Sequence, residues 1–308
     1  MRADLYQTIT IAIIDEIAKG AAPGQYRMPW HRDSGISTPR NAISGRNYRG
    51  INTLLLWAAA GNADFPSGEW ATYRQWVDAG AQVRKGERAT VVLLWSTLAA
   101  VEGDKSDGDD HREPGSQRVL ARAVYVFNAA QVDGYTPGPG ALPLAARFTN
   151  AESFFAALPA KVSYGSDDPF FDPVNDNVFL PAFGAFTSAE AYYSVYAHEL
   201  IHWTGAKARL DRDFSGRFAS ESYAMEELVA ELGAAFTVGY LGLASTPRND
   251  HASYIASWLS VLRADPRAIV TAASKAQAAA DYLITLAEPP NPQAATAGIP
   301  IVTVEQAA

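Results

Sequence analysis

The sequence predicts an α+β fold in two domains, a mixed α+β domain followed by a mostly helical one with a small edge sheet. Its 308 residues exceed the size at which a single hydrophobic core usually stops growing. Gly134–Pro143 contains three prolines, which favours an exposed linker. We therefore expect domains at residues 1–136 and 149–287, a linker at 137–148, and a disordered tail at 288–308, where Pro and Ala are frequent without helical periodicity.

Three segments of the N-terminal domain have helical signals. Residues 4–19 place a stripe of apolar side chains on one face, namely Leu5, Ile9, Ala12, Ile13 and Ile17. Asn52 and Thr53 are suitable N-caps for an apolar helix that extends through Ala60. Trp70–Ala79 is expected to form another short helix, which ends before a glycine.

The strand signals of this domain predict two hairpins. Ser44-Gly45 suits the turn between two short strands. Ala89–Ser96 and Val119–Phe127 are rich in β-branched and aromatic residues and predict an antiparallel pair. Residues 102–117 between them are polar, charged and aperiodic, so we expect a flexible loop there.

The C-terminal domain has a small strand region followed by helices. Asn150–Leu158 predicts a helix, and Lys161–Tyr164 and Asp176–Pro181 predict strands. Because the second strand ends in proline, we expect it at the edge of its sheet. Ser188 suits the N-cap of a helix over residues 189–203. Further helices are expected at 220–236, 251–262 and 267–286.

Composition restricts the cellular context. The chain is 48% hydrophobic, carries a net charge of −8 and has no cysteine, which excludes disulfide bonds. Its start lacks the apolar core of a signal peptide, because Asp4, Asp15 and Glu16 interrupt it. Apolar runs such as Leu54–Ala60 are too short to span a bilayer. We therefore expect a cytoplasmic protein without a membrane partner.

A His-Glu-x-x-His motif occupies residues 198–202. On a helix, His198 and His202 lie one turn apart on the same face, so both imidazoles can bind one divalent metal. Glu199 lies one residue along and can act as general base toward a water molecule. The motif therefore predicts a hydrolytic metal site, for which Zn²⁺ is the expected ion and another divalent metal is possible.

A third ligand is required, because catalytic zinc sites usually have three protein ligands and one open position. The helix predicted at 220–236 carries Glu227 and Glu231 on one face. We expect Glu227 to be the ligand and Glu231 to accept the free N–H of a liganding histidine. Glu226 lies further round the helix and is expected to face solvent. Glu231 and Asp211 are the alternatives for the third ligand.

Such a site would hydrolyse a peptide bond by attack of water on its carbonyl carbon. The sequence does not identify the protein substrate. A hydrogen-bond donor near the carbonyl oxygen would stabilise developing negative charge. Tyr223 and His251 are the candidates for this donor, and spacing alone places neither. We assign no role to His31 or His111, which lie outside the motif.

The N-terminal domain has a mildly basic character. Residues 1–136 contain 15 Lys and Arg against 15 Asp and Glu, but the segment 102–113 holds six of the acids and two of the bases, so the remainder has a net charge of +4. Basic residues interleaved with aromatics are typical of a surface that binds single-stranded nucleic acid. The candidate DNA-binding residues are Arg40, Arg46, Tyr48, Arg49, Arg84 and Lys85.

Two groups of motifs resemble the ArdC-type antirestriction proteins. His198–Gly205 and Tyr223–Glu231 are similar to that family's zincin-like metallopeptidase domain. Gly45–Asn52, Gln82–Glu87 and Val126–Asn128 are similar to its single-stranded-DNA-binding domain. The resemblance spans roughly residues 3–286. It implies a protein of plasmids or phages that binds single-stranded DNA and helps incoming DNA, as in plasmid conjugation, to evade host restriction.

The sequence departs from the family pattern in two places. Ser44-Gly45 stands where Thr-Gly is expected, and the acidic segment 102–117 resembles an insertion. Neither lies in the metal motif. The same N-terminal domain also occurs in plasmid primases of the TraC type, but no primase catalytic pattern is present.

Three functions are compatible with this sequence. In the first, a DNA-binding antirestriction factor has an active metallopeptidase site. In the second, the metal site is structural or vestigial and the DNA-binding domain acts alone. The third is a SprT-like protease that acts on DNA-bound proteins. Glu199 favours the first, because a purely structural metal site needs no general base.

Overall fold

The structure is a computed structural model of the 308-residue chain. It describes residues 2–21, 28–31, 38–98, 118–137, 143–212, 220–245 and 251–288. The predicted flexible loop at 102–117, the tail beyond residue 288 and His111 lie outside the described residues. Within the described part, no helix combines the length and apolar character that a membrane crossing requires.

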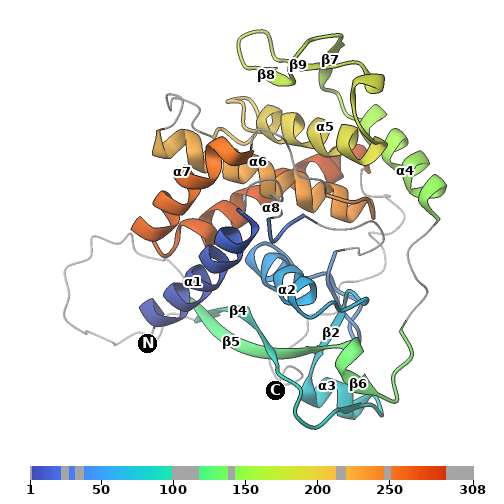
Figure 1. Cartoon of the computed structure of the whole chain (residues 1–308), viewed down its shortest axis with the longest axis vertical. Coiled ribbons are helices and arrows are strands. Elements are labelled where there is room, and N and C mark those ends of the chain that lie inside the picture. The colour runs from blue at the N-terminus through green and yellow to red at the C-terminus, as the bar shows by residue number, and fades with distance from the viewer. Residues whose placement is uncertain are drawn as a thin grey trace.

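The N-terminal half consists of helices and two small sheets (Figure 1). One sheet has the order β1-β2-β5-β4 and the other pairs β3 with β6. The helices are α1 (Arg2–Gly20), α2 (Ile51–Asn62), α3 (Tyr73–Asp78) and the 3₁₀ turn η1 (Ala129–Gln131). The strands are β1 (Arg40–Asn41), β2 (Glu69–Thr72), β3 (Gln82–Val83), β4 (Thr90–Leu98), β5 (Arg118–Asn128) and β6 (Val132–Asp133).

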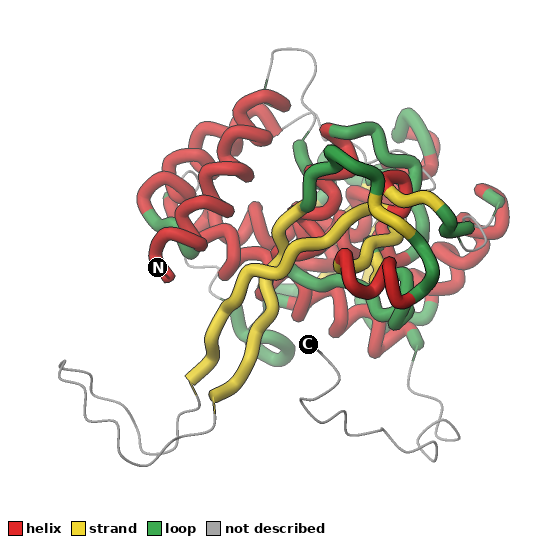
Figure 2. The backbone as a smooth tube through the Cα atoms, turned by 90° about the horizontal axis from the view of Figure 1, so that it is seen from below, coloured by secondary structure: helices red, strands yellow, loops and turns green. Residues whose placement is uncertain are grey.

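The predicted hairpin of Ala89–Ser96 and Val119–Phe127 is confirmed. Around Ser44-Gly45 the turn forms, but the predicted pair of strands does not, because Arg40 and Asn47 make only an isolated antiparallel bridge and β1 pairs in parallel with β2. Strands β4 and β5 are antiparallel, with Val91 opposite Tyr125, and Figure 2 shows their distal ends projecting away from the helices. In the turn at Ser44-Gly45, the Gly45 amide donates to the Asn41 carbonyl at 2.9 Å. Gly45 adopts φ of +69°, which glycine reaches without a Cβ clash.

Two helix predictions in the N-terminal half are wrong. Trp70–Ala79 is not one helix, because Glu69–Thr72 forms β2 and only the following residues are helical. Pairing of β2 with β5 outweighs the local helical pattern, and Thr72 caps α3 in a capping box with Gln75. Helix α2 follows Gly50, which makes no side-chain cap. Thr53 instead donates to the Tyr48 carbonyl at 2.8 Å.

The C-terminal half places a three-stranded sheet beside a helical bundle (Figure 1). Its helices are α4 (Leu144–Ala156), η2 (Phe183–Ala185), α5 (Ala189–Thr204), α6 (Glu221–Tyr240), α7 (His251–Ala264) and α8 (Ala268–Ala287). Its strands are β7 (Lys161–Tyr164), β8 (Phe170–Asp172) and β9 (Asn177–Leu180).

Two C-terminal predictions also need correction. The sheet order is β7-β9-β8, so β9 is central and its predicted position at the edge is wrong. Pro181 lies just after the strand and therefore interrupts no hydrogen bond of the sheet. Helix α4 spans Leu144–Ala156, so it begins and ends earlier than the predicted helix Asn150–Leu158.

The two halves share one hydrophobic core. Ile9, Ile13 and Ile17 of α1 are fully buried in the same cluster as the C-terminal helices, as their predicted stripe required, although Ala12 on that stripe is exposed. Burying one such side chain contributes about 1.5–3 kcal/mol. The Trp57 ring packs against Phe236, with centroids 5.9 Å apart. The N-terminal helices are therefore part of the scaffold that holds the C-terminal bundle.

Candidate metal centre

Helix α5 places the two histidines of the motif together. Ser188 caps the helix by accepting the Ala191 amide at 3.1 Å, as predicted. One turn separates His198 from His202, and their Nε2 atoms lie 3.1 Å apart. The side chain of His198 is 2% exposed and that of His202 is 13% exposed, so both imidazoles are largely shielded from solvent and His202 is the more accessible of the two.

Glu227 of α6 completes a group of three. Its carboxylate oxygens lie 3.5 Å from His198 Nε2 and 3.6 Å from His202 Nε2. The three donor atoms all fall within 4.8 Å of one another. Two imidazoles and one carboxylate with this spacing match the donor set of a divalent-metal site.

Close packing of α5 against α6 makes this meeting possible. Gly233 faces Ile201, and a Cβ on Gly233 would lie only 2.8 Å from Ile201 Cδ1. A larger residue at position 233 would push the two helices apart. The absence of a side chain there therefore sets the distance across which Glu227 reaches the histidines.

Each histidine also has a carboxylate at its other ring nitrogen. Glu231 Oε1 lies 3.1 Å from His198 Nδ1, and Glu226 Oε1 lies 3.1 Å from His202 Nδ1. Such partners fix the ring orientation and favour the tautomer in which Nε2 carries the free lone pair. The prediction that Glu226 faces solvent is wrong, since it is 8% exposed.

Arg212 holds Glu226 in place. Its guanidinium donates to both carboxylate oxygens of Glu226, at 2.9 and 2.8 Å. It also donates to the Ile201 carbonyl at 2.6 Å and to Thr204 Oγ1 at 2.8 Å, which ties the pair to the end of α5. Burial alone would raise the pKa of Glu226, but hydrogen bonds from His202 and Arg212 hold that pKa below its ordinary value.

The remaining predicted site residues fall in different places. Glu199 is buried on α5. The Tyr223 hydroxyl lies 3.2 Å from that of Tyr254, and burial, this contact and the charge of Glu227 raise the pKa of Tyr223. Asp211 is exposed and is not part of the three-residue group. The side chain of His251 lies outside the described residues.

Most of the predicted DNA-binding cations have acidic partners within the chain. Arg40 pairs with Glu69, and Arg49 pairs with Asp281 of α8. Arg84 pairs with Glu87 and Asp133. Tyr48 is half-buried, and its hydroxyl accepts from Asn41 Nδ2 at 3.3 Å.

Arg46 and Lys85 differ from these residues. Both are exposed, and neither side chain has an ion pair with another described residue. Their charges are therefore the more available for an anionic ligand.

The fold and the site define a two-domain protein with a zincin-like half, and comparison with known proteins agrees. Residues 149–275 match the family described as zincin-like metallopeptidase. Residues 3–127 match the N-terminal domain of anti-restriction factor ArdC. The crystal structure of the Mn(II)-bound antirestriction ArdC protein from plasmid R388 has a TM-score of 0.72 and 34% identity, covering 93% of this chain and 99% of that one. The chain therefore belongs to the ArdC-type antirestriction proteins.

Other relatives extend the comparison. The metal-free structure of the same R388 protein has a TM-score of 0.71. An uncharacterised protein, y4eC of Sinorhizobium fredii (strain NBRC 101917 / NGR234), is 49% identical over 282 residues and is covered to 91%. DNA primase TraC of Escherichia coli is 35% identical over 296 residues, but the chain spans only 27% of its length.

Proposed function

We propose that the protein is a single-stranded-DNA-binding antirestriction factor of mobile elements with a metal-dependent peptidase site. The observation that carries the peptidase assignment is the group of His198, His202 and Glu227, of which His198 and Glu227 are buried. Glu199 lies on α5 together with the two histidines. Membership of the ArdC family supports the antirestriction role and DNA binding by the N-terminal half.

The donor set supports a resident divalent cation. His198 Nε2, His202 Nε2 and a Glu227 carboxylate oxygen would hold it, and Zn²⁺ suits two imidazoles with one carboxylate. When bound, the cation would supply Lewis-acid activation of a peptide carbonyl. The Mn(II)-bound form of the R388 relative supports divalent binding at this fold.

The other residues have separate proposed tasks. Glu199 would accept a proton from the attacking water on its carboxylate and later donate it to the leaving amine. Tyr223 is held by Tyr254 with its proton tightly bound, which suits a hydrogen-bond donor to a developing oxyanion. Glu231 and Glu226 would keep the Nδ1 proton on each histidine.

Glu199→Gln separates an active peptidase from a structural or vestigial metal site. The variant keeps the three donors and removes the base, so metal content should equal that of the wild type while protection of the transferred plasmid should be lost. The assay compares plasmid transfer into restricting and non-restricting recipients, together with metal analysis. Glu221→Gln, on the exposed first turn of α6, is the control. Full protection by Glu199→Gln would exclude the peptidase role.

DNA binding has its own test. Affinity for single-stranded and duplex DNA of equal length should be measured across a salt series. Tighter binding of the single strand with a clear salt slope supports the proposal. Equal affinity and a slope near zero would exclude it. If single-stranded DNA also stimulates proteolysis, the activity is that of a SprT-like protease on DNA-bound proteins.

A further inference from the structure

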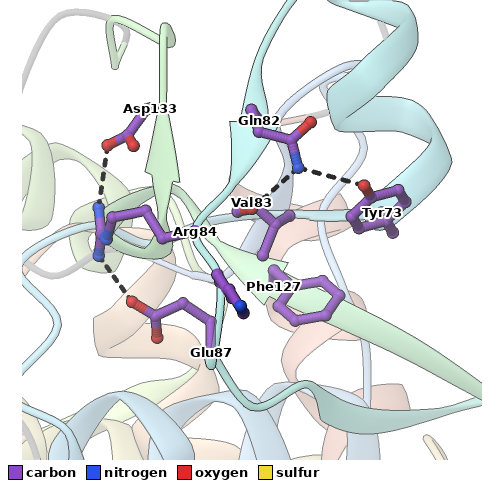
Figure 3. Close-up of a pocket in the computed structure, with 8 residues that line it drawn as sticks. Tyr73, Gln82, Val83, Arg84, Glu87, Phe127 and Asp133 are labelled. Atoms are coloured by element: carbon purple, nitrogen blue, oxygen red, sulfur yellow. Dashed lines mark hydrogen bonds and ion pairs between the residues drawn. The ribbon is translucent and has the colours of Figure 1, made fainter.

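A hollow on the N-terminal half, remote in sequence from the metal centre, lies between α3 and the turn that follows β3 (Figure 3). Its volume is about 530 Å³. The lining residues are Tyr73, Gln82, Val83, Arg84, Lys85, Glu87, Phe127 and Asp133. Aromatic and charged side chains thus face one another across a single open recess.

The aromatic side of the hollow is held in a fixed orientation. The rings of Tyr73 and Phe127 lie 6.4 Å apart and meet edge to face at 68°. Gln82 Nε2 donates to the Tyr73 hydroxyl at 3.1 Å (Figure 3). Tyr73 is nevertheless 50% exposed. A ring that is held yet half open can receive a flat ligand without a large loss of side-chain entropy.

The charged side is close to neutral inside the hollow. Arg84 Nη2 lies 2.9 Å from Glu87, and Arg84 Nη1 lies 3.4 Å from Asp133. Arg84 Nη2 also donates to the Ala130 carbonyl at 2.5 Å. Two carboxylates surrounding one guanidinium disfavour an anion there. Lys85 follows on the same turn without an ion pair among the described residues, so it can contact a phosphate.

We propose that this hollow seats one unpaired nucleobase of single-stranded DNA. The base stacks on Tyr73, while Lys85 contacts the phosphate next to it. Arg84 braces the turn and does not grip DNA. A neutral interior admits the uncharged base, and stacking tolerates any of the four bases. The inference rests on the proposed DNA binding and assigns it a location.

The test is fluorescence anisotropy of the full chain with labelled single-stranded oligonucleotides, with and without abasic positions. Tyr73→Ala should weaken binding of the intact oligonucleotide by about tenfold or more, and Tyr73→Phe should bind within about twofold of the wild type. Tyr125→Ala is the matched control, since Tyr125 is 61% exposed on β5 outside the hollow. It should leave affinity unchanged. Lys85→Gln should lower the salt slope by about 0.7.

A double comparison isolates stacking from folding. On a fully abasic strand, Tyr73→Ala and the wild type should bind equally, because no base is present to stack. If the wild type binds single-stranded DNA and Tyr73→Ala binds it equally well, the assignment of the hollow is refuted, while the DNA-binding proposal stands. If Tyr73→Ala and Tyr125→Ala lose the same affinity, the DNA lies on the open face of the sheet, and the assignment of the hollow is again refuted. A wild-type protein that binds no single strand refutes the proposed function itself.

Discussion

Arg212 grips Glu226 through two hydrogen bonds, of 2.9 and 2.8 Å, on the side of the carboxylate that also faces His202. The pair connects the loop after α5 to one of the three donor side chains. The geometry of this pair indicates that Arg212, which lies outside the His-Glu-x-x-His motif, orients His202 through Glu226.

Replacing Arg212 tests this orientation. Arg212→Gln should weaken affinity for Zn²⁺ by about 10- to 100-fold, because Glu226 loses its anchor and His202 its fixed ring position. The measurement is a competition titration against a chromogenic chelator. Arg209→Gln is the matched control, since Arg209 also donates to the end of α5, at the Trp203 carbonyl, but pairs with Asp176. Unchanged zinc affinity in Arg212→Gln would contradict the orienting role.

Metal removal should lower thermal stability. A ligand at 100 times its Kd stabilises the native state by about 2.7 kcal/mol, so a chelator should lower the Tm of the wild type. Glu227→Gln removes the carboxylate donor and should shrink this shift. Differential scanning fluorimetry with and without added Zn²⁺ measures both. An identical chelator response in the two proteins would mean that Glu227 is not a ligand.

A larger side chain at position 233 should destabilise the protein, because Gly233 packs against Ile201. Gly233→Ala places a methyl group 2.8–3.0 Å from three Ile201 side-chain carbons, which costs about 1–3 kcal/mol by overpacking. Gly61→Ala on α2 has open space and should gain up to about 1 kcal/mol. Urea unfolding measures both. Adding Ile201→Val to Gly233→Ala should recover part of the loss. Full stability in Gly233→Ala would show that the helices tolerate a wider separation.

Alkaline pH should destabilise the protein through Tyr196. Burial is the largest cause that raises the pKa of Tyr196. The charge of Tyr164 and a hydrogen bond with that residue raise it further. Because the pKa is higher in the folded state, the protonated tyrosine contributes its whole stabilisation at pH values below the unfolded-state pKa, which is near 10. That contribution is lost as the pH rises toward the folded-state pKa. Unfolding free energy should therefore fall above about pH 10, and less steeply in Tyr196→Phe. Tyr125→Phe, on an exposed ring, is the control. Parallel pH curves for all three proteins would refute the assignment.

Local spacing accounts for the parts of the site that could be predicted. His198 and His202 meet because they are four residues apart on one helix, and serine caps mark where α5 and α6 begin. The burial of Glu226 could not be read from spacing, because it depends on how α6 is rotated against α5. That rotation is fixed by tertiary packing such as Gly233 on Ile201.

The missed features depend on contacts that are distant in sequence. Arg212 lies in a loop without periodicity and acts through a helix that starts after it. Residues 69–72 became a strand because β5, far along the chain, offers them backbone partners. Strand β8 has only three residues, too few for an alternating pattern, so the central position of β9 could not be foreseen.

Helix α1 packs on α7, and Thr10 donates to the Pro266 carbonyl at 2.6 Å. During synthesis α1 therefore emerges from the ribosome long before the α7 segment on which it packs, and the delay is the time taken to make the residues between them. At typical elongation rates this delay lasts roughly 10–50 s. Throughout this delay the Ile9–Ile17 face can pack on α2 but lacks its partner α7, so chaperone capture of the nascent chain should include this partly covered face.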